Sequence, residues 1–211
     1  MPDTVESLTG HGIVVIYRGL TPRQCLLATS ILHEAGLRWF EVTMNSTTPL
    51  DTIRLLREEA PAGAHIGAGT VLDPDDVSRA ADAGATFMIS PHLDEKVVAR
   101  TKDEGLISIP GAFTPTEMVR AVAAGADLVK VFPVRPVGAG YIKQVRAPLP
   151  DIPIFVSGGV DAALAAECFA QGAAVAGVGA QLLGGDAAAT GDRERLTLAA
   201  RELLDARRAR Q

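Results

Sequence analysis

Short apolar runs rich in valine and isoleucine recur along the chain, each followed by a polar or glycine-bearing loop and then a segment with helical periodicity. Each run begins 19 to 26 residues after the one before, which leaves room for a crossover helix but not for a hairpin. Neighbouring strands are therefore expected to be parallel. The eight predicted strands are Ile13–Tyr17, Trp39–Val42, His65–Gly69, Phe87–Ser90, Leu106–Pro110, Leu128–Phe132, Ile154–Val156 and Val175–Val178.

Three of the intervening segments open with a capping residue plus proline and close with Ala-Gly, which are the usual start and stop signals of helices. They run from Thr21 to Gly36, from Asp73 to Gly84 and from Thr114 to Gly125. Eight regular units predict an α/β protein with a (β/α)₈ TIM barrel. A doubly wound open sheet is the competitor, but no dinucleotide fingerprint follows the first strand. We expect one domain over residues 1–211, with a short turn at Val5 to Leu8 and a helix from Arg193 to Arg208 added to the barrel.

Composition narrows the classes of function. Hydrophobic residues make up 47% of the 211, charged residues 21%, and the formal net charge is -5, which suits a globular protein and disfavours nucleic-acid or anionic-membrane partners. No apolar run approaches a membrane span and the start of the chain resembles no signal peptide, so we expect a cytoplasmic protein with a small-molecule partner. Cys25 and Cys168 fit no disulfide framework or zinc spacing, and the four histidines show no HxH or HExxH pattern. No metal or other cofactor is expected.

Active sites of TIM barrels lie at the carboxyl ends of the strands, and Lys130 stands in such a strand with apolar neighbours on both sides. Burial disfavours the charged ammonium, and a neutral amine can attack a carbonyl to form a Schiff base. The alternative is a lysine that only pairs with a carboxylate near the barrel mouth. The chain's other lysines, Lys96, Lys102 and Lys143, stand in helix-like segments where they can reach water.

Glu41 is likewise the only charge in its strand and could move a proton to or from carbon next to an imine. The alternative is a plain salt bridge from Glu41 to Lys130. Thr43 and Asn45 follow on the same side of that strand if its alternation persists, and would offer uncharged hydrogen bonds to a substrate.

Glycine-rich loops follow the last two strands, and their backbone amides could approach an anion closely. We expect a phosphate cradle from Gly158, Gly159, Gly179 and Ala180, although tight turns also need glycine. Thr70, after the third strand, is as readily a turn residue as a substrate contact. Arg18, directly after the first strand, could hold a substrate carboxylate or could be a solvated loop arginine.

Six motifs, in order and spacing, resemble the class I 2-keto-3-deoxy-6-phosphogluconate and 4-hydroxy-2-oxoglutarate aldolase family. They are Phe40-Glu41-Val42-Thr43, Gly67-Ala68-Gly69-Thr70-Val71-Leu72, Ile89-Ser90-Pro91, Ile109-Pro110-Gly111, Val129-Lys130-Val131-Phe132-Pro133 and Ser157-Gly158-Gly159-Val160. The resemblance implies a homotrimer that needs no metal, with Lys130 as the Schiff-base lysine and Glu41 as the general acid/base. It also implies that Thr70 and Pro91 contact the substrate and that Phe132 and Pro133 form part of the pocket wall.

Two positions depart from the phosphogluconate pattern. Asn45 stands where that branch has arginine. Asparagine at this position looks more like the 2-keto-3-deoxy-6-phosphogalactonate aldolase branch, and the substrates of the two branches differ only in configuration at C4. Ala180 stands where relatives often have serine, so a phosphate there would depend more on backbone amides. The expected reaction is cleavage of a 2-keto-3-deoxy-6-phospho sugar acid to pyruvate and glyceraldehyde 3-phosphate. The alternatives are a phosphosugar isomerase or epimerase and a non-catalytic phosphosugar-binding module.

Overall fold

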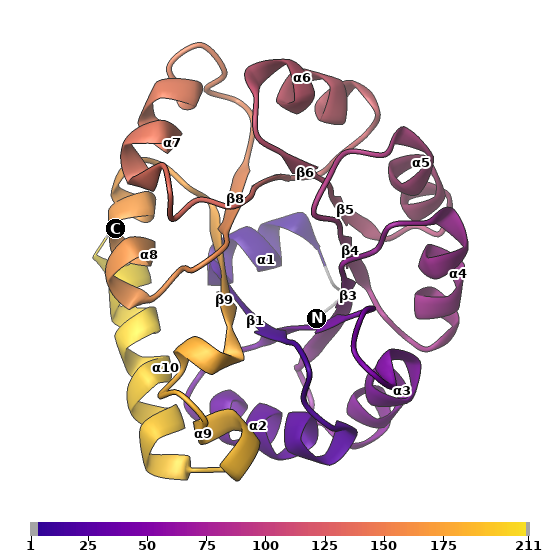
Figure 1. Cartoon of the computed structure of the whole chain (residues 1–211), viewed down its shortest axis with the longest axis vertical. Helices are drawn as coiled ribbons and strands as arrows, with labels where there is room; N and C mark the ends of the chain where they lie inside the picture. Colours follow the sequence, from indigo (N-terminus) through magenta and orange to yellow (C-terminus); the bar gives the residue numbers. More distant parts are fainter. Residues whose placement is uncertain (1–3, 210–211) are drawn as a thin grey trace.

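The computed structural model describes residues 4–209, and in this range the strands form a ring of parallel strands surrounded by helices (Figure 1). The strands are β1 (Ile13–Tyr17), β2 (Trp39–Thr43), β3 (His65–Gly69), β4 (Phe87–Ile89), β5 (Ile107–Ile109), β6 (Gly111–Ala112), β7 (Val129–Val131), β8 (Ile154–Ser157) and β9 (Val175–Gly179). Their order is β5-β4-β3-β2-β1-β9-β8-β7-β6, and every pairing is parallel. The barrel prediction is confirmed.

The fifth predicted strand is divided in two, so nine labelled strands correspond to eight predicted ones. Pro110 has no backbone N–H and separates β5 from β6. On one side of this strand Ser90 N donates to Ile109 O (3.1 Å), and on the other Lys130 N donates to Pro110 O (2.8 Å). The broken strand therefore joins β4 to β7 and closes the ring.

Helices cover the outside of the ring, and their starts follow the sequence signals. They are α1 (Val5–His11), α2 (Pro22–Glu34), α3 (Pro49–Glu59), α4 (Pro74–Asp82), α5 (Glu95–Asp103), α6 (Pro115–Ala123), α7 (Gly138–Arg146), α8 (Ala162–Ala170), η1 (Ala180–Leu182), α9 (Ala187–Thr190) and α10 (Arg193–Arg208). The side chains of Thr21, Asp73 and Thr114 each accept a bond from a backbone N–H in the first turn of their helix, which confirms the three predicted caps.

The two predicted additions differ in how well they match. The C-terminal helix has the expected bounds, whereas the turn at Val5 to Leu8 extends to His11 as a seven-residue helix. α1 crosses the far end of the barrel in Figure 1. The domain was expected to run from residue 1 to residue 211; residues 1–3 and 210–211 lie outside the described part of the chain. None of the helices between residues 4 and 209 is long and apolar enough to cross a membrane.

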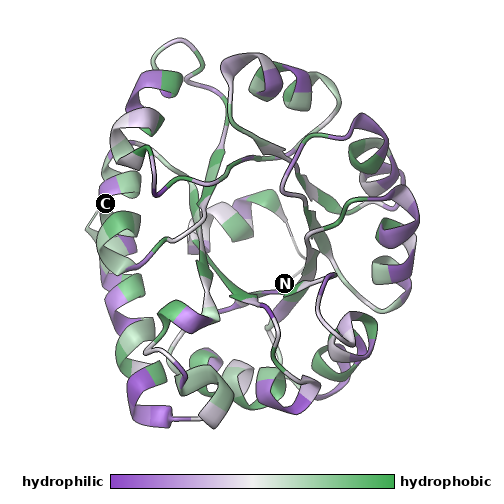
Figure 2. Ribbon diagram, viewed as in Figure 1, coloured by the Kyte–Doolittle hydropathy of each residue, from purple (hydrophilic) through white to green (hydrophobic). Residues whose placement is uncertain are grey.

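Successive side chains of each strand point to opposite faces, and this alternation divides the hydrophobic core into two clusters. Val15, Phe40 and Val42 point outward and belong to the large cluster under the helices. Val14, Trp39 and Phe155 belong to a smaller cluster that fills the lower barrel and also contains Leu8 of α1. Figure 2 shows hydrophobic residues along the strands and hydrophilic residues on the outer faces of the helices. With this end filled by apolar side chains, the open end of the barrel lies at the carboxyl ends of the strands.

Candidate active site

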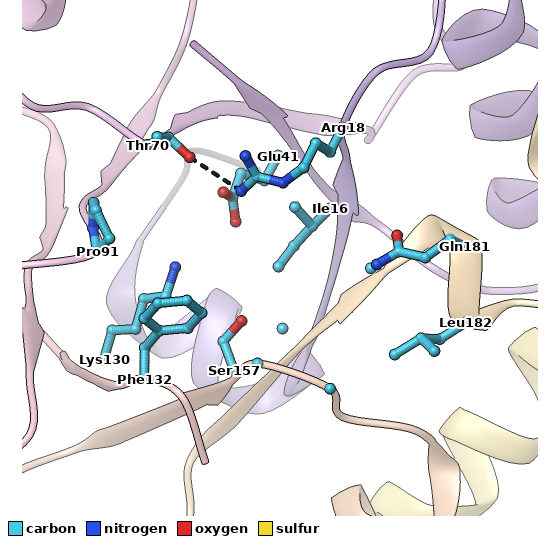
Figure 3. A pocket seen from close by; sticks show the side chains of 14 residues that line it. Ile16, Arg18, Glu41, Thr70, Pro91, Lys130, Phe132, Ser157, Gln181 and Leu182 are labelled. Atoms are coloured by element: carbon cyan, nitrogen blue, oxygen red, sulfur yellow. Dashed lines mark hydrogen bonds between the residues drawn. The ribbon is translucent and has the colours of Figure 1, made fainter. Parts of the chain in front are cut away.

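A cavity of about 410 Å³ opens at the carboxyl ends of the strands (Figure 3). It is lined by residues from seven separate strands or the loops that follow them. They are Ile16, Arg18, Glu41, Thr70, Pro91, Lys130, Phe132, Ser157, Gly158, Gly159, Gly177, Gly179, Gln181 and Leu182. Nine of the thirteen residues predicted for the site are among them. The other four, Thr43, Asn45, Pro133 and Ala180, do not line it.

Lys130 lies in β7, where it alternates with two outward-pointing valines and projects into the barrel. Its side chain is buried, and Nζ lies 5.1 Å from the centroid of the Phe132 ring. Burial lowers the pKa of the Lys130 ammonium, with nearby Arg18 acting in the same direction, while Glu41 opposes the shift. The arrangement favours a neutral amine that faces the cavity.

Glu41 in β2 projects into the same space and is almost completely buried. Burial raises the pKa of the Glu41 carboxyl group, and the cations Lys130 and Arg18 oppose that rise. Its Oε2 atom is buried without a hydrogen-bond partner. No ion pair within 4.0 Å joins Glu41 to Lys130 in residues 4–209, so the salt-bridge alternative receives no support.

Gly69 explains how the carboxyl group of Glu41 fits beside the neighbouring strand. The two residues are close across the β2–β3 pair, and a Cβ placed on Gly69 would lie 1.5 Å from Glu41 Oε1. Gly67, one layer lower, leaves similar room for the Phe87 ring, which would lie 2.4 Å from an added Cβ. The two glycines of this strand therefore serve packing, and Gly69 serves the packing of Glu41 itself.

Arg18 is held over Glu41 by two neighbours. Its Nη1 donates to Asn45 Oδ1 at 2.7 Å and its Nη2 donates to Thr70 Oγ1 at 3.2 Å, the second bond being drawn in Figure 3. Thr70 has a positive φ of 56°, an uncommon conformation for threonine that brings its side chain to the cavity. Asn45 therefore reaches the site through Arg18 and not by lining it.

Thr43 does not line the cavity; it is fully buried, and its Oγ1 lies 3.0 Å from Ser46 Oγ. Pro91 and Phe132 do line the cavity, and the Phe132 ring covers Lys130 in Figure 3. Phe132 is followed by the cis peptide bond to Pro133. The exposed fraction of Phe132 is 39%, which makes this ring part of the open wall of the site.

The glycine-rich loops after β8 and β9 form another part of the cavity wall, in which Gly158 lies beside Phe132 and Pro133. Gly158 and Gly159 have φ values of 96° and 77°, which disfavour any side chain there. In the described chain their backbone N–H groups donate to no protein carbonyl. Gly179 also lines the cavity, whereas Ala180 is buried beneath it. Free amides at Gly158 and Gly159 suit an anion.

Five lining residues were missed by the sequence reasoning. Ile16, Ser157 and Gly177 lie on barrel strands, and their inward alternation could have identified them. Gln181 and Leu182 lie on η1, a short turn with no periodic pattern, and the sequence carries no signal for them. Between residues 4 and 209, no group of three or more histidine, cysteine, aspartate or glutamate side chains is placed to hold a metal ion.

Known proteins resemble this chain in sequence and in fold. Residues 9–199 match a family model described as KDPG and KHG aldolase. A probable 2-dehydro-3-deoxy-6-phosphogalactonate aldolase of Rhizobium meliloti is 39% identical over 171 residues, 81% of each chain. The 2-dehydro-3-deoxy-6-phosphogalactonate aldolase of Escherichia coli is 35% identical over 81% of this chain and 83% of its own. A solved structure described as native KDPGal superposes with a TM-score of 0.85 at 33% identity, covering 93% of this chain and 94% of the other.

Proposed function

The chain belongs to the KDPG and KHG aldolase family, and from that premise we propose the residues and the substrate of its reaction. It is a Schiff-base aldolase that cleaves a 2-keto-3-deoxy-6-phospho sugar acid to pyruvate and glyceraldehyde 3-phosphate. The observation that carries the proposed mechanism is the buried amine of Lys130, which faces a cavity shared with the buried carboxyl group of Glu41.

Lys130 attacks the C2 carbonyl carbon of the substrate to form a carbinolamine. A proton from the Glu41 carboxyl group lets the carbinolamine lose its hydroxyl group as water, which leaves a protonated imine and the Glu41 carboxylate. The burial that lowers the lysine pKa supplies the neutral amine for this step. The imine carries a positive charge, which then accepts the electron pair released when the C3–C4 bond breaks.

Glu41 takes the proton of the C4 hydroxyl group, directly or through a water molecule, as that bond breaks and glyceraldehyde 3-phosphate forms. The cationic imine and Arg18 favour the carboxylate form needed here, although burial alone would favour the protonated acid. Glu41 then returns a proton to C3 of the enamine, and hydrolysis of the imine releases pyruvate and regenerates Lys130.

Arg18 binds the substrate carboxylate in this scheme. Its guanidinium is planar, stands at the edge of the cavity and is oriented by Asn45 and Thr70. Asn45 is short and neutral and does not line the cavity, and its contribution is to hold Arg18 through Oδ1. The phosphate lies at the opposite end, over the amides of Gly158 and Gly159, near the N-terminus of α8.

We propose that the galactonate configuration at C4 is preferred, a choice supported by Asn45 and by the two relatives named above. The two alternative activities receive no support, since an isomerase or a binding module needs no lysine amine and the relatives are named aldolases. We also propose the homotrimer that the family resemblance implies. Light scattering would then give three times the chain mass of 22.0 kDa.

The substrate assignment is tested by kcat/KM for the two C4 epimers, followed through the pyruvate released. We expect the galactonate epimer to be preferred but not exclusive, and Asn45→Arg to shift the ratio toward the gluconate epimer. A native enzyme that strongly prefers the gluconate epimer, with no shift in Asn45→Arg, would remove the epimer assignment and leave the aldolase assignment standing.

A further inference from the structure

Gln181 occupies the end of the cavity where the phosphate is proposed to bind. It lies on η1 directly after β9, and Figure 3 shows it across the cavity from Lys130 and Phe132. A Cβ built on Gly179 would lie 2.5 Å from both Nε2 and Oε1 of Gln181. The side-chain amide therefore fills the space left by this glycine.

This position changes the interpretation of Gly179. A glycine at the end of the last barrel strand could let an anion approach the backbone, but here the Gln181 side chain occupies that space. The amide of Gln181 forms no hydrogen bond in the described part of the chain, and Gln181 is exposed to the cavity. It is therefore available to a ligand as a donor through Nε2 and as an acceptor through Oε1.

The charges around this end of the cavity make such a donor useful. Arg18 and Lys130 are the only lysine or arginine side chains among the lining residues of the described chain. Lys130 lies across the cavity from Gln181 in Figure 3, and the guanidinium of Arg18 donates to Asn45 and Thr70. Arg135 lies near Gly159 but its guanidinium is engaged, since Nε donates to Gly159 O and Nη2 pairs with Asp161. Ala180 offers no hydroxyl group. The groups that line this end of the cavity itself are therefore neutral.

We propose that Gln181 is a specificity-determining residue, whose side-chain amide donates a hydrogen bond to the phosphate of the substrate alongside the Gly158 and Gly159 amides. This inference rests on the proposed function. It predicts that Gln181 discriminates between phosphorylated and unphosphorylated substrates and takes no part in imine formation at Lys130.

The test uses the reaction in the direction of synthesis, in which pyruvate is first bound as the enamine on Lys130. The two acceptors are glyceraldehyde 3-phosphate and D-glyceraldehyde, which differ only by the phosphate. Gln181→Met keeps the side-chain length without the amide. We expect it to lower kcat/KM for glyceraldehyde 3-phosphate about tenfold, because a hydrogen bond to a charged group is lost, and to change kcat/KM for D-glyceraldehyde less than about twofold.

Gln181→Glu adds a charge that repels phosphate and should lower kcat/KM for the phosphorylated acceptor further than Gln181→Met does. Gln144→Glu, which adds the same charge on the exposed face of α7, is the matched control and should leave both acceptors unchanged. Equal losses for both acceptors would overturn the inference in favour of a packing role. An unchanged kcat/KM in both Gln181 variants would also overturn the inference. So would a higher kcat/KM for glyceraldehyde 3-phosphate, because the native amide would then only obstruct the phosphate.

Borohydride reduction with pyruvate alone separates this inference from the function on which it rests. The reduced adduct on Lys130 should form equally in the native protein and in Gln181→Met. If the native protein forms no adduct, the proposed function fails. If the adduct forms but the two acceptors respond alike to Gln181→Met, only the role of Gln181 fails.

Discussion

Lys130 and Glu41 are both buried at the cavity, and their surroundings shift the pKa of each side chain from its ordinary value. Burial shifts the pKa of Lys130 downward and that of Glu41 upward, so both shifts favour neutral forms before substrate binds. Within residues 4–209 no direct ion pair joins the Lys130 and Glu41 side chains. The pair suits a reaction in which the lysine nitrogen gains a positive charge as a protonated imine and the carboxyl group acts as a base in its negative form.

Replacing Lys130 by methionine should abolish cleavage while the fold survives, because methionine has a similar volume and lacks the amine. We expect kcat to fall at least about a thousandfold. Lys143→Met, on the exposed face of α7, should leave kcat unchanged. Circular dichroism would verify that both variants fold, and appreciable turnover by Lys130→Met would contradict the role of the amine.

Gly69→Ala tests whether the position of Glu41 limits catalysis. The new methyl group would occupy the space of Glu41 Oε1 and force the carboxyl group to move, although the backbone of Gly69 is not in the positive-φ region. We expect kcat to fall about tenfold or more, because proton transfer depends on the placement of the catalytic group, and the pH profile of kcat to shift.

The control for that experiment is Gly10→Ala, at the far end of the barrel, where an added Cβ meets nothing within 4 Å. It should leave kcat and its pH profile unchanged. A Gly69→Ala enzyme with native kcat and pH profile would show that Glu41 tolerates displacement, and the proposed proton transfer through Glu41 would need revision.

Helix starts are the elements for which local sequence determined structure most directly. The side-chain oxygen of Thr114 accepts a hydrogen bond from Glu117 N. In return, Glu117 Oε2 accepts a hydrogen bond from Thr114 N at 2.7 Å. Pro115 fits the first turn because its missing N–H has no intrahelical partner there. The same arrangement of cap and proline begins α2 and α4. These three crossover helices therefore begin at defined residues.

Removal of this cap should destabilise the protein without affecting the active site. Thr114→Ala should lower the free energy of unfolding by about 1 kcal/mol, measured by urea denaturation. Thr116→Ala, exposed on the same helix, should cost less than half of that. Equal costs for the two variants would show that the cap contributes nothing beyond helix propensity.

Elements without a periodic signal were not predicted. The segment that contains η1 and α9 is rich in alanine and glycine and alternates in no regular way, so neither helix was expected. Pro110 was expected to end the fifth strand, but tertiary pairing on both sides continues the strand past it. Lys130 and Glu41 were found because charge in an apolar strand is costly, whereas Gln181 lies in a turn where a glutamine costs nothing. Sequence alone therefore predicted the two buried ionisable residues of the cavity but not Gln181 on η1.

The molecule as a whole has one closed and one open end. α1 lies across the amino end of the barrel, and His11 at its last position accepts a hydrogen bond at Nε2 from the backbone of Arg38 (3.3 Å). Burial, together with the charges of Arg38, His65 and Arg207, lowers the pKa of His11 to about 4. The neutral imidazole is thus part of the closure opposite the active site.

Stability should consequently fall as this end is titrated with acid. His11 takes up its proton near pH 6.5 in the unfolded chain but only near pH 4 in the folded one, so the unfolded state binds more protons between these values. Stability is then lost as pH falls from about 6.5 to about 4, by up to about 3 kcal/mol from this residue.

The measurement is urea denaturation of the native protein and of His11→Gln at pH 7 and pH 4.5. Because both proteins share all other titrations, the difference between their unfolding free energies isolates the histidine. The native protein should lose more stability than His11→Gln over this interval. A constant difference between the two proteins would rule out His11 as the acid-sensitive group.

Reduction of the protein by borohydride in the presence of pyruvate tests the central claim most directly, because it records the imine itself. After proteolysis, the account predicts a single N-(1-carboxyethyl) modification on the peptide that contains Lys130, and none in Lys130→Met. Absence of the adduct, or an adduct confined to another lysine such as Lys143, would contradict a Schiff-base aldolase that works through Lys130.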